Sequence, residues 1–381
     1  MNGNIAVRVL VLCGTRPEVI KMAPVVMELR QTPGIEPILC FTGQHRSMAE
    51  MAMQVFGLTP DIDLNVMKHG QSLEGLTASL LSSLGAVLEE KKPDLILVQG
   101  DTTSAMVGAL AGFYRNIRVG HVEAGLRTGN MKHPWPEEGN RRIVGLLAWR
   151  HYTPTDVATG NLLREGVEAS RIVQTGNPVV DALQWVKKRI DVTSADQARM
   201  MEKFGSLGVG HKIVLVTGHR RESFGGNFES ICRAIREIAS RSDTTVIYPV
   251  HLNPNVREPV NRILGGVPNV HLLEPLAYDE FVFLMGRATV ILTDSGGVQE
   301  EAPSLGKPVL VMRETSERRE AIDAGVAKLV GTSFEQIVRE TTLLLDDPQA
   351  YAAMAHVSNP FGDGSASKKI AEDLLRNAVN P

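Results

Sequence analysis

Residues 290–301 read Val-Ile-Leu-Thr-Asp-Ser-Gly-Gly-Val-Gln-Glu-Glu, and this stretch decides the fold. The apolar run 290–292 predicts a buried strand. Ser295 is a typical N-cap residue, and we expect it to begin a helix that has acidic side chains in its first turn. The stretch therefore predicts a strand, a tight turn and the start of a helix.

The two glycines in this turn suggest an anion-binding site. Gly296 and Gly297 leave the backbone uncovered, so unpaired N–H groups at the helix start can approach a phosphate closely. Glu300 and Glu301 then supply an acceptor for ribose hydroxyls, as an acidic residue does in dinucleotide-binding folds. The alternative interpretation is an ordinary capped strand-to-helix turn.

Short apolar runs alternate with helical patterns along most of the chain. The runs that we expect to form strands are 8–12, 37–42, 95–99, 118–123 and 171–175 in the first half, and 213–217, 245–250, 270–273, 290–293, 309–312 and 328–330 in the second. This alternation is typical of α/β proteins, in which helices cover both faces of a parallel sheet.

The length of 381 residues predicts two domains, each able to bury its own core. The alternation pauses near residue 176, where the charged helical stretch 181–204 precedes a glycine-containing linker at 205–210. A breaker cluster at 359–364 would let the last helix, 367–378, return to the first domain. The expected domains are residues 1–175 plus 366–381, and residues 176–365.

Composition excludes several classes of partner. The chain has 40 basic and 43 acidic residues, so its formal charge of −3 provides no field for nucleic acid or an anionic membrane. Cys13, Cys40 and Cys232 are widely spaced in apolar patterns, which indicates reduced thiols in the cytoplasm. The first apolar run contains Arg8 and is expected to be a strand rather than a signal peptide. No uncharged stretch approaches ~20 residues, so we expect no membrane span.

Charged and polar residues follow the expected strands, at the edge where parallel sheets bind ligands. In the first half they are Arg16, Glu18, Lys21, Asp101, Glu123, Glu137 and Glu138, and in the second half His219, Arg220, Arg221, Glu222 and His251. Structural alternatives are a solvated helix start for Arg16 and Lys21, an N-cap for Asp101, and exposed loop charges at 137–138. The cationic group around His219 suits a diphosphate.

Missing motifs narrow the chemistry. No Gly-x-Gly-x-x-Gly follows the first strand, and the chain has no P-loop and no Tyr-x-x-x-Lys, so neither NAD nor a P-loop nucleotide site is supported. The ten histidines show no His-x-x-x-His pair and there is no Cys-x-x-Cys, so we expect no metal site. A set of carboxylates in the first domain and an anion site in the second remain. Together they suit proton abstraction coupled to departure of a nucleotide phosphate.

Motifs spread over nearly the whole chain, in family order, resemble the non-hydrolysing bacterial UDP-N-acetylglucosamine 2-epimerase family. They are Gly14-Thr15-Arg16-Pro17-Glu18, Gly43-Gln44-His45, Gln99-Gly100-Asp101-Thr102-Thr103, residues 121–128, Pro136-Glu137-Glu138, Thr175-Gly176-Asn177, Gly218-His219-Arg220-Arg221-Glu222 and residues 294–307. The resemblance implies two Rossmann-like parallel-sheet domains in the GT-B architecture, with the nucleotide in an interdomain cleft.

The resemblance also implies an isomerase that needs no cofactor. A base removes the proton on sugar carbon 2 while UDP leaves carbon 1, and UDP adds back to the 2-acetamidoglucal as the proton returns on the opposite face. The implied protein is a cytoplasmic homodimer that converts UDP-GlcNAc to UDP-ManNAc for cell-envelope polysaccharide biosynthesis. The alternatives are a 2-epimerase of a modified UDP-sugar such as a diacetamido-uronate, a hydrolysing 2-epimerase that releases UDP and ManNAc, a GT-B glycosyltransferase, and a nucleotide-sugar sensor.

Residue roles follow from the resemblance position by position. The implied catalytic residues are Asp101, Glu123, Glu137 and His219, and the base is one of the three carboxylates. The implied substrate-binding residues are Arg16, Lys21, Phe281, Ser295, Gly296, Gly297, Glu301 and Arg318. A second, regulatory site for UDP-GlcNAc matches at Gln44, Arg220 and His251, together with Glu137.

Three positions depart from the usual family pattern. Ser47 stands where many members have a longer polar side chain, and Gly70 stands where they have an arginine. Both departures concern the second site, and they also fit a modified sugar. Arg319 replaces a proline, which would make the loop around Arg318 less rigid.

Overall fold

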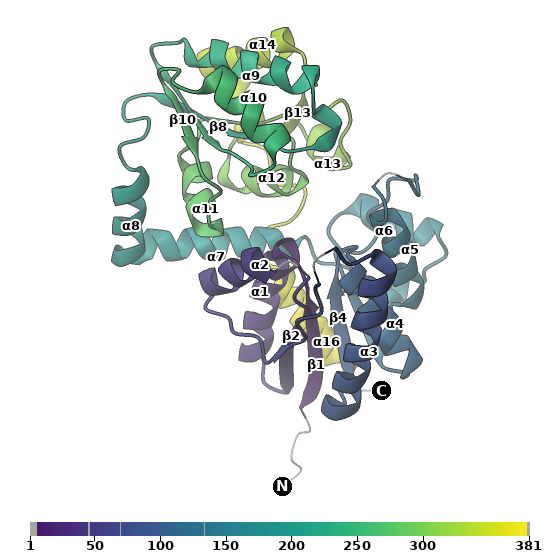
Figure 1. Cartoon of the computed structure of the whole chain (residues 1–381). Coiled ribbons are helices and arrows are strands. Elements are labelled where there is room, and N and C mark those ends of the chain that lie inside the picture. The colour runs from purple at the N-terminus through teal and green to yellow at the C-terminus, as the bar shows by residue number, and fades with distance from the viewer. Residues whose placement is uncertain (1–5, 45, 69, 133, 379–381) are drawn as a thin grey trace. The chain divides into compact units, whose positions relative to one another are not determined.

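The computed structural model describes residues 6–44, 46–68, 70–132 and 134–378, apart from the side chains of Arg46, Ser47 and Ala378. The chain forms two compact units (Figure 1). Met1–Ala182 and Phe361–Pro381 make up the first unit, here called the N-terminal domain. Leu183–Pro360 make up the second, here called the C-terminal domain.

The N-terminal domain is built on a parallel sheet of seven strands in the order β3-β2-β1-β4-β5-β6-β7. The strands are β1 Val7–Cys13, β2 Ile35–Phe41, β3 Ile62–Asp63, β4 Leu95–Gln99, β5 Arg118–Val122, β6 Arg150–Thr153 and β7 Ile172–Gln174. The helices are α1 Arg16–Gln31, α2 Arg46–Val55, α3 Leu73–Lys91, α4 Thr103–Tyr114, α5 Glu137–Leu147, α6 Asp156–Arg164 and α16 Ala366–Ala378.

The sheet is buried on both faces, as parallel sheets are. Val9, Leu10 and Val11 of β1 are fully buried, although successive side chains point to opposite faces. Figure 1 shows α16 beside the sheet of this domain. Asp373 of α16 pairs with Arg150 at 2.7 Å and accepts a hydrogen bond from the Tyr152 hydroxyl at 3.0 Å. These contacts fix the last helix to the domain in which the chain begins.

The C-terminal domain contains a second parallel sheet, with the order β10-β9-β8-β11-β12-β13. Its strands are β8 Lys212–Thr217, β9 Thr244–Pro249, β10 Val270–Leu273, β11 Val290–Thr293, β12 Val309–Val311 and β13 Ala327–Leu329. Its helices are α8 Ser194–Phe204, α9 Gly226–Ala239, α10 Pro254–Leu264, α11 Tyr278–Arg287, α12 Gly296–Glu301, α13 Arg319–Asp323, α14 Phe334–Asp346 and α15 Pro348–Ala355, while α7 Pro178–Val192 joins the two domains.

The hydrophobic core of the C-terminal domain lies under α9, α10 and α14, whose apolar faces cover one side of the sheet (Figure 1). Val290 and Leu292 of the central strand β11 are fully buried in this core, and Ile291 is fully buried on the opposite face. The expected fold class, two parallel-sheet α/β domains, is therefore confirmed. None of the helices in the described part of the chain is both long and apolar enough to cross a membrane.

The expected linker at 205–210 is wrong. This segment lies inside the C-terminal domain, where the Arg287 guanidinium donates to the carbonyl oxygens of Phe204 and Leu207 at 2.7 and 3.0 Å. The chain instead passes between the domains within α7, at residues 182–183, and returns at residues 360–361. The start of α7 belongs to the N-terminal domain, because the Asp181 carboxylate accepts from two backbone N–H groups at the start of α16.

Two strands, β3 and β6, were not predicted. The first has only two residues. The second reads Arg-His-Tyr-Thr, a polar run that resembles a loop, yet its last three residues are buried. Arg150 and Tyr152 can lie in the sheet because Asp373, far away in the sequence, pairs with both. The stretch 181–204 also differs from the expected single helix, because Thr193 separates α7 from α8.

Two buried histidines in this sheet should make stability depend on pH. His121 and His151 are paired across β5 and β6. Burial lowers the pKa of His121 to about 4 and that of His151 to about 3. In the described chain neither ring nitrogen of His151 has a hydrogen-bond partner. The unfolded chain binds protons near pH 6.5, so the stability from each neutral histidine is present above that pH and is lost as the pH falls.

We expect each histidine to reduce the free energy of unfolding by about 1 kcal/mol between pH 7.5 and pH 5.5. Urea unfolding of His151→Leu should therefore show roughly half of the wild-type loss over this range. His356→Gln, which removes an exposed histidine, should behave as wild type. An unchanged pH dependence in His151→Leu would contradict this account.

Candidate active site

Glu123 is the centre of a polar cluster at the carboxyl ends of β4 and β5. The residue follows β5, is 6% exposed and has a φ of +61°, which is rare outside glycine. Asn177 donates to Oε1 at 2.9 Å, the Lys21 ammonium pairs with the same oxygen, and Gln99 donates to Oε2. Three donors from α1, β4 and the segment before α7 therefore fix one buried carboxylate. Strained backbone at such a position is typical of functional sites.

Lys21 was given two interpretations, and the structure decides between them. Its side chain is buried, so the solvated helix start is wrong for this residue. Arg16 is the first residue of α1 and is half-buried. The two cations lie on the same helix, and the deeper one, Lys21, pairs with the carboxylate of Glu123.

Asp101 lies at the next strand end and is held by α5. Its carboxylate pairs with Arg141 at 2.6 Å, and its carbonyl oxygen accepts from the Asn140 amide at 2.9 Å. Arg141 also pairs with Glu138, which is fully buried, at 3.3 Å. The N-cap of α4 is Thr102, so the interpretation of Asp101 as a cap is wrong. Asp101 is thus a partly exposed carboxylate whose position is set by an arginine.

Glu18 connects the loops that follow β1 and β4. Its carboxylate accepts from the Gly14 N–H at 3.0 Å, the Thr15 hydroxyl at 2.8 Å and the Thr102 hydroxyl at 2.7 Å. Burial raises the pKa of Glu18 to about 7, although these hydrogen bonds oppose the shift. The loop before Arg16 and the loop that follows Asp101 are therefore joined by one buried acid.

Glu137 and Glu138 begin α5 and have different roles. Glu138 is fully buried and is paired with Arg141 and Arg142, so it is a structural residue. Glu137 is half-buried, and its Oε2 is a buried oxygen without a hydrogen-bond partner in the described chain. Neither residue is an exposed loop charge. Glu137 keeps an acceptor available for a ligand, close in sequence to the arginine that holds Asp101.

In the C-terminal domain the turn after β11 forms as expected, but its cap differs. Ser295 occupies the N-cap position of α12, and its side chain makes no capping hydrogen bond. Its N–H instead donates to the Thr293 hydroxyl at 2.9 Å. The first turn of α12 contains no acidic residue, so this expectation is also wrong. The N–H groups at Gly296 and Gly297 are consequently not covered by a serine cap, which suits an anion.

The acidic residues of α12 point into the protein, where each has a partner. Arg318 donates from Nε to Glu300 at 2.6 Å, and the Tyr278 hydroxyl donates to Glu301 at 2.6 Å. A Cβ added to Gly296 would lie 3.3 Å from the Arg318 guanidinium carbon. The arginine therefore lies directly against the bare backbone of the helix start. The Arg318 guanidinium and the N–H groups at the start of α12 thus place positive charge and hydrogen-bond donors side by side.

Hydrogen bonds hold the loop before Arg318 in place, although this chain has Arg319 where many family members have a proline. The Ser316 hydroxyl accepts from the Arg318 N–H at 3.0 Å and donates to Gln299 of α12 at 2.7 Å. Arg319, which replaces the proline, is exposed and begins α13. The hydrogen bonds of the Ser316 hydroxyl thus restrict the loop, as a proline would.

His219 follows β8, beside the same turn. Its Nδ1 lies 3.2 Å from the Asp294 carboxylate, and its ring stacks on His251 with centroids 5.5 Å apart. Arg220 lies 3.7 Å from Glu317. Phe281 is in the first turn of α11, where its N–H donates to the Ala277 carbonyl oxygen. The expected histidine and arginines therefore surround the end of β8.

The residues of the expected second site lie in both domains. Gln44, in the N-terminal domain, accepts from the Ser104 hydroxyl at 2.9 Å. Gly70 lies in an exposed turn with a φ of +70°. Arg220 and His251 belong to the C-terminal domain. His45 and the side chain of Ser47 lie outside the described residues.

Sequence reasoning assigned no site role to five residues that the structure places in these clusters. They are Gln99, Arg141, Asn177, Tyr278 and Asp294. Most of them stand in or beside the motifs that carry the family resemblance. For all except Tyr278, a position near a strand end or a predicted acid was a usable signal.

The N-terminal domain holds a fixed carboxylate cluster, and the C-terminal domain has an uncovered helix start beside an arginine. These features are typical of a two-domain α/β enzyme of the nucleotide-binding type. The profile of the UDP-N-acetylglucosamine 2-epimerase family matches residues 27–375. The chain belongs to this family, which confirms the resemblance seen in the motifs.

Relatives match over nearly the whole chain. A UDP-N-acetylglucosamine 2-epimerase of Escherichia coli K12 is 52% identical over 374 residues, which cover 98% of this chain and 100% of the relative. The crystal structure of UDP-GlcNAc 2-epimerase from Neisseria meningitidis bound to UDP-GlcNAc superposes with a TM-score of 0.92 at 47% identity, covering 97% of this chain and 100% of that chain. The S. aureus MnaA-UDP co-structure gives a TM-score of 0.87 at 41% identity, with coverages of 98% and 97%.

Proposed function

We propose that this protein is a non-hydrolysing UDP-N-acetylglucosamine 2-epimerase that interconverts UDP-GlcNAc and UDP-ManNAc without a cofactor. The observation that carries the proposal is Glu123, a buried carboxylate fixed by Lys21, Gln99 and Asn177 at the ligand-binding edge of a parallel sheet. Membership of the epimerase family supports the same activity. A glycosyltransferase of the same fold does not need acids that exchange a carbon-bound proton.

The reaction breaks two bonds and then restores them. A carboxylate removes the proton on carbon 2, the C1–O bond breaks, and its electron pair leaves with the diphosphate. The 2-acetamidoglucal then takes UDP back at carbon 1 and a proton on the opposite face of carbon 2. Removal and return need groups on both faces, and we assign them to Asp101, Glu123 and Glu137. Their surroundings differ, as an acid and a base require.

The UDP moiety has its proposed contacts in the C-terminal domain. We place its diphosphate at the N–H groups of Gly296 and Gly297, beside the Arg318 guanidinium and the Ser295 side chain. The ribose would lie at Glu301, the uracil at the backbone of Phe281, and the leaving diphosphate at His219. Arg16 and Lys21 would supply positive charge on the side of the sugar.

A product assay tests the proposal. Incubation with UDP-GlcNAc should produce UDP-ManNAc to an equilibrium mixture, with the total amount of UDP-sugar conserved in the NMR spectrum. Accumulating UDP and free ManNAc would identify a hydrolysing enzyme. Turnover only of a UDP-diacetamido-uronate would identify a modified substrate, and turnover only with an added acceptor would identify a glycosyltransferase.

Gln44, Arg220 and His251, with Glu137, would bind a second, regulatory UDP-GlcNAc. The rate should then rise sigmoidally with UDP-GlcNAc, and Gln44→Ala should make the curve hyperbolic. A hyperbolic curve for the wild-type enzyme would remove this site.

We further propose a cytoplasmic location, which rests on three buried free thiols, Cys13, Cys40 and Cys232. If removal of the reductant lets a disulfide form and the enzyme loses activity, the result is consistent with that location. A stable disulfide in the active native protein would argue against it.

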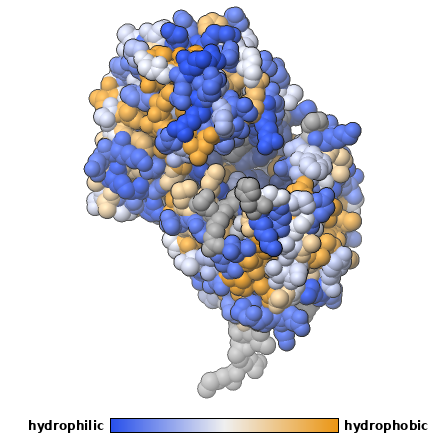
Figure 2. Space-filling view, viewed as in Figure 1, coloured by the Kyte–Doolittle hydropathy of each residue, from blue (hydrophilic) through white to orange (hydrophobic). Residues whose placement is uncertain are grey.

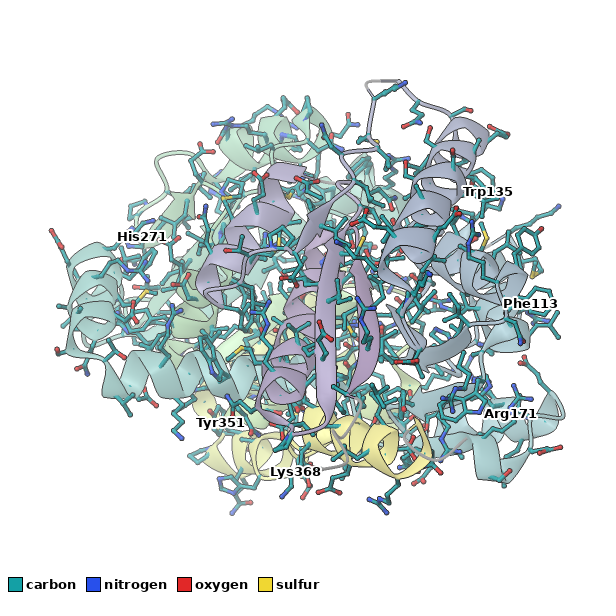
Figure 3. All side chains as sticks on the ribbon, turned by 90° about the horizontal axis from the view of Figure 1, so that it is seen from below. Phe113, Trp135, Arg171, His271, Tyr351 and Lys368 are labelled. Carbon is teal, nitrogen blue, oxygen red and sulfur yellow. The ribbon has the colours of Figure 1, made fainter. Side chains whose placement is uncertain are left out.

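A second copy of the chain is the partner that we propose for the apolar flank of the N-terminal domain. Phe113 and Tyr114, at the end of α4, are 58% and 63% exposed, and Leu146 of the adjacent α5 is 82% exposed. Figure 2 shows apolar surface on the flank where these helices lie, and Figure 3 shows Phe113 at the outer side of the domain. Large apolar side chains gathered in one place mark association surfaces.

Light scattering after size-exclusion chromatography should give a dimer for the wild-type protein. The double variant Phe113→Lys/Leu146→Lys should be a monomer, because it places charges on both helices. Leu163→Lys, on α6, changes an exposed leucine elsewhere and should leave the dimer intact. A wild-type monomer, or a double variant that is still dimeric, would refute this interface.

A further inference from the structure

Asp294 is a buried carboxylate that the proposed reaction does not yet use. It follows β11 and is 2% exposed. Its Oδ2 accepts from the backbone N–H groups of His219 and Arg220 at 2.7 and 2.8 Å. Its Oδ1 is buried and accepts no hydrogen bond in the described chain, and it lies 3.2 Å from Nδ1 of His219. One acid therefore holds the backbone at His219 by hydrogen bonds and lies within ion-pair distance of the ring of the same histidine.

The surroundings fix the ring in this orientation. His251 stacks on a face of the ring, with an interplanar angle of 20°. The Tyr248 hydroxyl donates to the Gly218 carbonyl oxygen at 3.0 Å, and a Cβ at Gly218 would lie 3.1 Å from the same hydroxyl. The backbone before His219 thus has little freedom. With Nδ1 facing Asp294, Nε2 lies on the other side of a ring that is 41% exposed.

We propose that Asp294 is a positioning residue that keeps the proton of His219 on Nδ1, leaves Nε2 for the leaving diphosphate, and balances the imidazolium charge. This inference rests on the proposed function. When the C1–O bond breaks, the electron pair goes to the diphosphate oxygen, and the Nε2–H of the imidazolium donates to that oxygen. When UDP adds back, the same hydrogen bond is released and no net proton is consumed. A carboxylate behind a histidine is an established way to fix its tautomer.

Asp294 is charged at neutral pH. Burial raises its pKa, but the contact with His219 and the two backbone N–H groups outweigh burial, so the net pKa is lowered. The other titratable groups that face this pair are His251, Arg220 and the buried Tyr248. Burial and the neighbouring His219 lower the pKa of His251, so it does not compete for the proton.

The variant Asp294→Asn tests the inference through a split between catalysis and binding. Its amide has nearly the same shape and can still accept from the backbone. It carries no negative charge to balance the imidazolium, however, and its NH₂ group could face Nδ1, so the Nε2–H of a charged ring would be lost at lower pH. We expect kcat to fall by about 100-fold, the alkaline limb of the kcat–pH profile to move to lower pH, and the Kd of UDP to stay within about threefold. In the His219→Gln background the same substitution should cost almost nothing more.

Glu340→Gln is the matched control, because Glu340 is a buried, paired carboxylate of α14 in the same domain. It should leave kcat and the pH profile unchanged. An Asp294→Asn enzyme whose kcat and pH profile match the wild type, or one that loses activity equally in the His219→Gln background, would overturn the inference.

Wild-type protein gives an independent test if Asp294→Asn does not fold. In ¹⁵N-histidine NMR spectra, with the His219 signals assigned by His219→Gln, neutral His219 should carry its proton on Nδ1. A proton on Nε2 would overturn the inference. This result does not depend on turnover, so failure of the enzyme to epimerise UDP-GlcNAc would refute the proposed function and leave the tautomer test to decide the role of Asp294.

Discussion

Replacing Glu123 with glutamine should lower kcat by at least ~100-fold while the Kd of UDP stays within about threefold. The amide has the size of the carboxylate, so the packing of the cluster around it is preserved. It has no negative charge for Lys21, however, and one of its two ends can no longer accept from Gln99 or Asn177. Steady-state kinetics and calorimetric titration with UDP measure the two quantities separately. Asp101→Asn and Glu137→Gln should lower kcat by a similar factor.

Asp156→Asn is the control for these three variants. Asp156 is an exposed acid at the start of α6, one strand further along the same sheet edge. Its loss should leave kcat within about twofold. A Glu123→Gln enzyme with wild-type kcat would remove Glu123 from the chemistry, and an equal effect of Asp156→Asn would show that charge at this edge, rather than a particular acid, matters.

Arg318→Met should have the second-largest effect and should act on binding. A charge-assisted hydrogen bond is worth about 1.5–3 kcal/mol, so the Kd of UDP should rise by roughly 10- to 150-fold. The guanidinium lies against the backbone of Gly296, so its removal also takes away the donor nearest to the proposed diphosphate position. Calorimetric titration with UDP measures this change directly.

Arg319→Met is the matched control, since it removes the adjacent arginine, which is exposed. The Kd of UDP should change by less than about twofold. Arg318→Met also removes the buried ion pair between Arg318 and Glu300, and removing one partner of such a pair is costly. Arg318→Lys retains the charge beside Glu300 but not the planar fork, so it should fold normally and still bind UDP weakly. Wild-type affinity in both Arg318 variants would exclude this residue from the nucleotide site.

The sequence predicted strands best where local pattern and tertiary environment agree. Leu95–Gln99, Val270–Leu273 and Val290–Thr293 were predicted at their observed bounds. Leu95–Gln99 and Val290–Thr293 are mostly apolar runs that the parallel sheet buries on both faces, whereas Val270–Leu273 is a half-buried edge strand. Arg150–Thr153 shows the opposite case. Arg150 and Tyr152 of this strand have their polar partner in Asp373 of α16, a contact that no local window can show.

For the site as well, local pattern identified some residues, whereas tertiary contacts decided the others. Asp101 and Glu123 were singled out because they stand just after strands, where parallel sheets bind ligands, and their proposed roles came from the family resemblance. Their partners Arg141 and Asn177 could not be assigned from spacing, because contacts across elements decide which neighbour reaches the acid. Ser295 occupies the predicted N-cap position of α12, but its side chain makes no capping hydrogen bond. Thr293, at the end of the preceding strand, accepts from the Ser295 N–H and holds the turn in place.

The most direct test of the central claim is the reaction of UDP-GlcNAc in deuterium oxide, followed by NMR at sugar carbon 2. Carboxylates that remove a carbon-bound proton while UDP departs must exchange that proton with solvent. We therefore predict that deuterium enters carbon 2 of both UDP-GlcNAc and UDP-ManNAc, that total UDP-sugar is conserved, and that Glu123→Gln slows the exchange by at least ~100-fold. Formation of UDP-ManNAc with the original hydrogen retained at carbon 2 would contradict the account.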